Sequence, residues 1–210
     1  MSTTPSLTGP GLIYATSRDL STPSNIKSIP IAFSAHYKCK DAAEEQKKYL
    51  GLYHMQDLRV LGVGVRERLE GAIGVLGKDV DVRAYREIQV YGRDGNDVPH
   101  TIISASMQPT PAGGPDLDAW YRDEHNEQMS RERGYVRTRR YRLVHQIKPQ
   151  GATECSDAPE WLGLHEFEEE NPWGDTVVPL DPMSEWTKKV MAAQERIEAG
   201  MYVKVSGEDV

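Results

Sequence analysis

The sequence is poor in cysteine and in long apolar stretches. Its 210 residues include two cysteines, Cys39 and Cys155, which are too few and too far apart for a disulfide framework. No apolar run approaches the roughly 20 residues that a membrane-spanning helix requires. Residues 1–11 also lack the basic and apolar segments of a secretory signal. These absences predict a reduced, cytoplasmic protein that has no membrane partner.

Positive charge is also in deficit. The 25 Lys and Arg residues are outnumbered by 32 Asp and Glu residues, which gives a net charge of −7. Because a nucleic-acid-binding surface must be cationic, nucleic acid is not an expected partner. Histidine spacings such as H-x-H or H-x-x-x-H are absent, and Gly62-Val63-Gly64 lacks the third glycine of a dinucleotide fingerprint. We therefore expect neither a metal nor another cofactor.

Two parts of the chain resemble each other. Leu50-Gly51-Leu52 and Leu162-Gly163-Leu164 each follow an aromatic residue, and the strand-like stretch 12–17 resembles 102–107. Because the two pairs occur in the same order, a duplicated domain is the simplest interpretation. We expect a disordered tail, a degenerate first repeat and a complete second repeat, over residues 1–10, 11–92 and 100–206.

The second repeat has the element order of a ferredoxin-like unit. Helical spacing over residues 115–134 and 182–199 alternates with strand-like segments, which gives β-α-β-β-α-β. The first repeat follows the same order but lacks the first helix. Two such units packed sheet to sheet would cover the apolar face of each sheet. The predicted fold class is therefore α+β, a pseudo-dimeric α/β barrel made of two ferredoxin-like repeats.

The helix predicted over residues 115–134 carries the main candidate for chemistry. Trp120, Tyr121, Glu124 and His125 recur at steps of three and four, so they share one face of the helix. A histidine and a neighbouring carboxylate on the inward face form a candidate acid/base site. Packing of the histidine in the core is the alternative interpretation.

The motif Trp-Tyr-x-x-Glu-His is followed by a Gly-Tyr turn and by Arg-Arg-Tyr-Arg-Leu at residues 139–143. This combination resembles the EthD-like members of the dimeric α/β-barrel superfamily. The resemblance covers the second half of the chain, and it reaches the first half only through the repeat. It implies a cleft between sheet and helices, and cofactor-independent lyases or cyclases acting on polyketide-like or aromatic intermediates of secondary metabolism. It also implies that the helix histidine, His125, serves as acid/base.

We therefore predict a cofactor-independent lyase or cyclase, of the decarboxylase, dehydratase or ring-closing type, that acts on a small-molecule keto acid. His125 is the predicted acid/base, and Tyr121 and Glu124 are its predicted partners. An arginine can hold a substrate carboxylate through two hydrogen bonds. The residues predicted to bind substrate are Trp120, Arg139, Tyr141 and His165.

Two other functions remain open at this stage. One is a non-catalytic barrel module that binds a small molecule or a protein, and the other is a cofactor-free oxygenase or redox auxiliary. A cleft that opens to solvent beside His125 favours an enzyme, whereas a cleft plugged by Trp or Met favours the binding module. In either case the duplication predicts a monomer that acts as an internal pseudo-dimer, or a weak homodimer.

Overall fold

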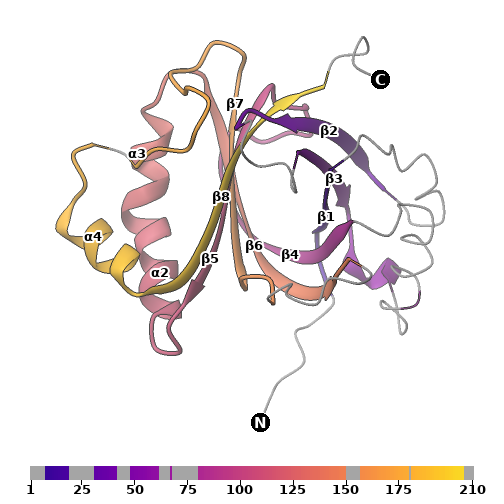
Figure 1. Cartoon of the computed structure of the whole chain (residues 1–210), viewed down its shortest axis with the longest axis horizontal. Helices are drawn as coiled ribbons and strands as arrows, with labels where there is room; N and C mark the ends of the chain where they lie inside the picture. Colours follow the sequence, from indigo (N-terminus) through magenta and orange to yellow (C-terminus); the bar gives the residue numbers. More distant parts are fainter. Residues whose placement is uncertain are drawn as a thin grey trace.

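The computed structural model describes these ranges of the chain: 8–18, 31–41, 48–61, 67, 80–149, 157–179 and 181–205. Within them the chain consists mainly of strands, and the longer helices lie in its second half (Figure 1). Most of the predicted tail falls outside the described residues, as does most of the segment between β3 and β4. No helix in the described part is long and apolar enough to cross a membrane.

Eight strands form one closed barrel in which all neighbouring pairs are antiparallel. Around the barrel the strands follow the order β1-β3-β2-β8-β5-β7-β6-β4, and β4 returns to pair with β1. Each of these strands therefore has a neighbour on both sides, although β2 and β8 pair over only three residues of each strand. The strands are β1 (Gly11–Ser17), β2 (Phe33–Cys39), β3 (Tyr49–Met55), β4 (Asp81–Gly92), β5 (Thr101–Pro109), β6 (Tyr135–Ile147), β7 (Trp161–Phe167) and β8 (Gln194–Lys204).

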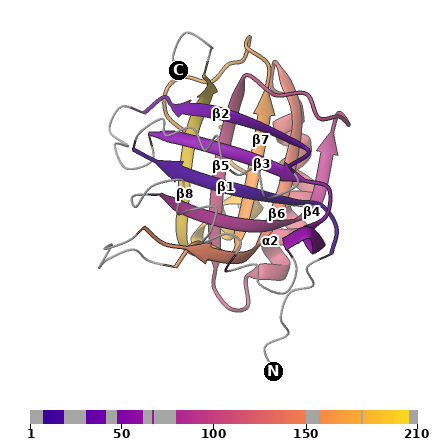
Figure 2. The same ribbon diagram turned by 90° about the vertical axis from the view of Figure 1, so that its right-hand side faces the viewer.

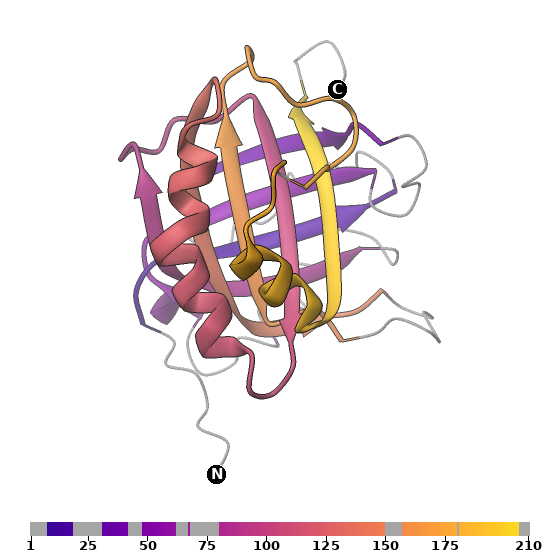
Figure 3. The same cartoon turned by 90° about the vertical axis from the view of Figure 1, so that its left-hand side faces the viewer.

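The predicted fold class, two ferredoxin-like repeats packed sheet to sheet, is wrong. The halves do not form separate sheets, because backbone ladders join β4 to β6 and β2 to β8. Residues 11–92 and 100–206 each supply four strands to a single sheet that closes on itself. Figures 2 and 3 show the strands of the first half crossing those of the second on opposite sides of the barrel. Spacing along one strand does not reveal which strand pairs with its outer edge, so the sequence alone did not indicate this closure.

The helices cover one outer face of the barrel. The segments α2 (Gly114–Trp120), η4 (Tyr121–His125) and α3 (Asn126–Ser130) run on as one helix, so the helix predicted over residues 115–134 is present but ends at Ser130. This helix and α4 (Glu185–Ala192) lie over β5, β7 and β8 (Figure 3). The first half contributes the short 3-10 turn η3 (Leu58–Leu61).

The second predicted helix, over residues 182–199, is too long. The α-helix ends at Ala192, and residues from Gln194 onward belong to β8. Trp186, Val190 and Ile197 are spaced as on one helix face, but the ladder between β8 and β5 pairs Ile197 with Met107. Tertiary pairing has therefore overridden the local helical pattern.

The Leu-Gly-Leu motif has the same role in both halves. It lies in β3 and in β7, and each glycine makes room for a tyrosine hydroxyl. A Cβ atom on Gly51 would lie 2.8 Å from the Tyr53 hydroxyl, and one on Gly163 would lie 2.6 Å from the Tyr121 hydroxyl. The sequence repeat that we identified therefore marks the places where an aromatic ring packs directly on the sheet.

Strand alternation fills the barrel interior with leucine and tyrosine side chains from both halves. Strand β6 adds charge to this core: Arg137 Nε donates to Glu166 Oε2 at 2.5 Å, and both side chains are almost fully buried. Arg139 pairs with Glu87 at 3.0 Å. Although arginines occur on both faces of β6, it is not an edge strand. It is paired on both sides, and Glu166 and Glu87 neutralise its inward arginines.

Candidate active site

A π-helical turn, η4, lies at the centre of the candidate site. The backbone N–H of Asn126 donates to the carbonyl of Tyr121, five residues earlier, instead of four. Such turns are rare and recur at functional sites. Tyr121 and His125, at the two ends of the turn, both reach the ring of His165 on β7. The turn therefore brings two residues of the predicted motif onto the outer face of the barrel.

Four rings form an aromatic cluster between this helix and β7: Trp120, Tyr121, His125 and His165. The His125 ring stacks on Trp120, with centroids 4.1 Å apart and planes inclined by 15°. It meets Tyr121 and His165 edge to face, with centroids 5.1 Å away in each case. The structure thus brings together four of the predicted site residues, one of them from a different element.

The cluster contains polar atoms without partners. His125 Nδ1 and the Tyr121 hydroxyl are buried and make no hydrogen bond with any described residue. His165 differs, because its Nδ1 lies 2.9 Å from the Thr138 hydroxyl. An unpaired buried polar atom costs about 1–3 kcal/mol, so its retention requires an explanation such as a functional role.

Burial sets the protonation of the cluster. It lowers the pKa of His125 to about 4, although a side-chain hydrogen bond with Gln128 acts in the opposite direction. Burial also lowers the pKa of His165 well below its usual value, and the charge of Arg140 adds to this effect. Burial raises the pKa of Tyr121 to about 12. At neutral pH both imidazoles are therefore uncharged and the phenol is protonated.

A cavity of about 300 Å³ opens beside the cluster, at the lower end of the range for small-molecule sites. All four clustered rings contribute to its wall, and apolar side chains make up most of the remainder. No Lys, Arg, Asp or Glu is among the described residues that line it. Its rim includes Val178, Met183 and Ile197, which are 55%, 38% and 43% exposed. The cavity therefore suits an uncharged, apolar ligand.

Glu124 lies beside the cavity and not in its wall. Its Oε1 accepts hydrogen bonds from the hydroxyls of Ser184 and Thr187, at 2.6 and 2.9 Å, and from Trp120 Nε1 at 3.3 Å. Although burial acts to raise it, these bonds lower the pKa of Glu124 overall. Ser184 also caps the N-terminus of α4. Glu124 therefore ties the two helices together, and this geometry favours a positioning role.

Arg139 and Tyr141 are not brought to the cavity. Both point into the barrel, where Tyr141 is 0% exposed and Arg139 pairs with carboxylates. The neighbouring Arg140 faces the helix, and its guanidinium carbon lies 4.3 Å from the centre of the Tyr121 ring. The face of β6 that approaches the aromatic cluster is thus that of Arg140.

Further residues close the cavity from the loop between β7 and α4, and none of them was among the predicted site residues. Trp173, Val177 and Val178 contribute to the wall from this loop. Trp173 is fixed by an edge-to-face contact with Phe167, at 5.6 Å between centroids. The available indication was the number of large apolar residues within a loop, since loops are usually polar.

Comparison with known proteins finds similar structures but no match by sequence. No protein-family model matches the chain, and no curated protein matches it. An anthrone oxidase-like protein superposes with a TM-score of 0.56 at 11% identity, covering 98% of this chain and 96% of that one. A provisionally assigned monooxygenase from Lactobacillus acidophilus gives 0.51 at 9% identity, covering 93% and 94%. Another, from Fusobacterium nucleatum subsp. nucleatum, gives 0.56 at 7% identity, covering 94% and 93%.

At these identities the likeness shows a shared fold alone. The resemblance to the EthD-like family and to the dimeric α/β-barrel superfamily therefore stays a prediction.

Proposed function

We propose that this protein is a cofactor-independent oxygenase that removes a proton from an uncharged, electron-rich aromatic substrate and allows the resulting anion to react with dioxygen. The observation that carries the proposal is an uncharged imidazole, His125, in the wall of an apolar cavity with an exposed apolar rim. The names of the three structural neighbours, one anthrone oxidase-like and two monooxygenases, support this choice among proton-transfer reactions.

The pKa of His125 defines the substrate more closely. A base whose conjugate acid has a pKa of about 4 is weak, so the proton that it removes must be acidic. A methylene group between aromatic rings and conjugated with a ketone meets this need, as does a phenol. The mainly apolar wall offers few groups that could hold water beside the anion, which limits simple reprotonation.

The electrons for oxygen reduction come from the substrate. In the methylene case, His125 takes one proton, and the electron pair left on carbon reduces dioxygen and forms a carbon–oxygen bond. The resulting hydroperoxide loses water, and the second hydrogen of the methylene leaves with it. One methylene and one dioxygen thus give one carbonyl and one water, without a redox cofactor.

The cavity wall also bears on the keto-acid lyase that the sequence suggested. A keto acid needs a cationic partner for its carboxylate, and no such side chain is among the described residues of the wall. Dehydration or ring closure of an uncharged polyketide-like substrate starts with the same proton removal, so it is the second candidate. Dependence of turnover on dioxygen separates the two.

Replacing His125 with Gln tests the proposal. We expect kcat for oxygen uptake, measured with tricyclic aromatic ketones, to fall about 10²–10⁴-fold, the usual contribution of a general base. His145→Gln is the matched control, because His145 lies on β6 and outside the cavity wall. Equal activity of H125Q and H145Q, with both variants folded by circular dichroism, would exclude His125 as the base. Product formation without dioxygen would favour the dehydratase or cyclase.

The pH profile provides a separate prediction. Since His125 must be unprotonated, the acid limb of kcat/KM should fall near pH 4 and not near pH 6.5. Gln128→Leu removes the hydrogen bond that raises this pKa, so the limb should move to lower pH. If the acid limb of the kcat/KM profile stays near pH 6.5 in both proteins, another group controls the rate.

A further inference from the structure

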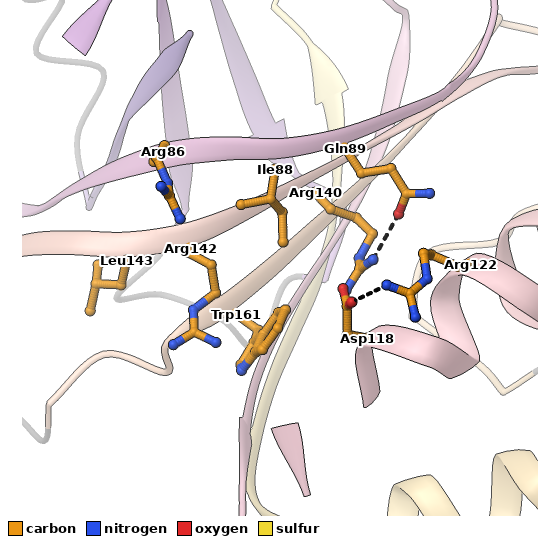
Figure 4. A pocket seen from close by; sticks show the side chains of 9 residues that line it. All are labelled: Arg86, Ile88, Gln89, Asp118, Arg122, Arg140, Arg142, Leu143 and Trp161. Atoms are coloured by element: carbon orange, nitrogen blue, oxygen red, sulfur yellow. Dashed lines mark hydrogen bonds and ion pairs between the residues drawn. The ribbon is translucent and has the colours of Figure 1, made fainter. Parts of the chain in front are cut away.

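A second pocket, of about 540 Å³, lies where β4 and β6 pass the start of the helix (Figure 4). Its lining shares no residue with the cavity beside His125. Four arginines, Arg86, Arg122, Arg140 and Arg142, converge on it from three elements of the fold. This concentration of positive charge is unexpected in a chain whose net charge is −7.

The carboxylates near the pocket do not balance these arginines. Asp118 serves two of them: its Oδ2 accepts from Arg122 at 2.6 Å and its Oδ1 lies 2.9 Å from Arg140. Glu160 pairs with Arg142 at 2.8 Å. The Nε atom of Arg86 is buried and has no hydrogen-bond partner among the described residues. Four cations therefore face two carboxylates.

The pocket is also held rigidly. The side chain of Arg140 is 3% exposed, and its Nη1 donates to Gln89 Oε1 at 2.7 Å. The guanidinium of Arg142 stacks on the Trp161 ring at 4.0 Å. Figure 4 shows Arg140 extending toward Asp118 and Gln89, and Arg142 extending toward Trp161. Arginines held in this way can bind an oxyanion without first losing conformational freedom.

We propose that this arginine pocket binds a small organic molecule through a carboxylate or phosphate group. The unpaired Nε of Arg86 and the surplus of guanidinium groups supply the oxyanion contacts. Ile88 and Leu143 supply an apolar wall for the rest of the molecule. The volume exceeds what an inorganic ion needs, which favours an organic ligand.

Isothermal titration calorimetry at constant ionic strength tests this site with three probes: inorganic phosphate, phenyl phosphate and benzoate. We expect saturable binding of phenyl phosphate or benzoate that is tighter than that of inorganic phosphate. Saturable binding of phenyl phosphate alone would indicate a phosphate ligand, and saturable binding of benzoate alone would indicate a carboxylate ligand. Arg86→Gln should weaken binding at least about tenfold, as expected for loss of a charged hydrogen-bonding group.

Arg131→Gln is the matched control, because Arg131 is an exposed arginine that pairs with Glu127 outside the pocket. The R131Q variant should bind the probes with the same affinity as the unaltered protein. Arg142→Gln provides a second pocket variant should R86Q fold poorly. Absence of saturable binding for all three probes would overturn the proposal, and so would equal affinity in R131Q and in a folded pocket variant. H125Q should retain full binding, so this test is independent of the proposed oxygenase activity.

Discussion

Replacing Arg137 with Leu should lower the free energy of unfolding by about 3–5 kcal/mol, the usual effect of removing one partner of a buried ion pair. The Arg137 side chain is 1% exposed and contacts Glu166 and Asp97 at 2.5 and 2.9 Å. Without it, Glu166 remains buried beside a weaker contact from Arg139, at 3.3 Å. Burial already raises the pKa of Glu166, so the loss leaves a poorly compensated carboxylate. Urea denaturation monitored by circular dichroism measures the change.

Two further variants separate charge from packing. Arg131→Leu removes an exposed arginine from an ion pair at the helix surface, and it should change stability little. The double variant Arg137→Leu with Glu166→Leu should recover much of the stability, because two apolar side chains replace two buried charges. If R137L unfolds at the same urea concentration as R131L, the buried pair does not stabilise the barrel.

Gly163→Ala should disturb the packing of the candidate site. The new Cβ would lie 2.6 Å from the Tyr121 hydroxyl, closer than real contacts allow. Tyr121 is 3% exposed and is held between His165 and Arg140, so it has little room to move. Overpacking of this kind costs about 1–3 kcal/mol. Because His125 packs against Tyr121, turnover should fall together with the thermal midpoint.

Tyr121→Phe should restore part of the stability that is lost in G163A. It removes the hydroxyl that the Cβ would strike, so G163A combined with Y121F should be more stable than G163A alone. Gly51→Ala is the matched control in the first half, where the new Cβ would lie 2.8 Å from the Tyr53 hydroxyl. It should lower stability while leaving kcat unchanged. Additive effects of G163A and Y121F would contradict the proposed clash.

The sequence predicted local features better than global ones. The helix over residues 115–134 and the two Leu-Gly-Leu strands were predictable, because spacing and turn residues specify local structure. The inward placement of His125 followed from the same spacing. The sharing of one sheet by both halves did not, since it depends on ladders between strands far apart in the chain. Residues 194–199 were assigned to a helix for the same reason.

The candidate site was likewise predictable only where its residues are close in the sequence. Trp120, Tyr121 and His125 lie on one helix, so their proximity could be predicted. Which face of β6 meets that helix depends on the register of the barrel, and the sequence favoured Arg139 where the structure places Arg140. The convergence of four arginines from separate elements on one pocket is equally a property of the closed barrel.

During synthesis, β2 is made long before the strand that covers its outer edge. Its partner β8, which pairs Tyr202 with Cys39, is the last strand among the described residues. Until β8 emerges from the ribosome, β2 presents an open edge on which another chain can add a strand. Exposed Lys38 lies on that edge, and a lysine there opposes such addition. Lys38 thus reduces the risk of aggregation at the strand edge that stays unpaired for the longest part of synthesis.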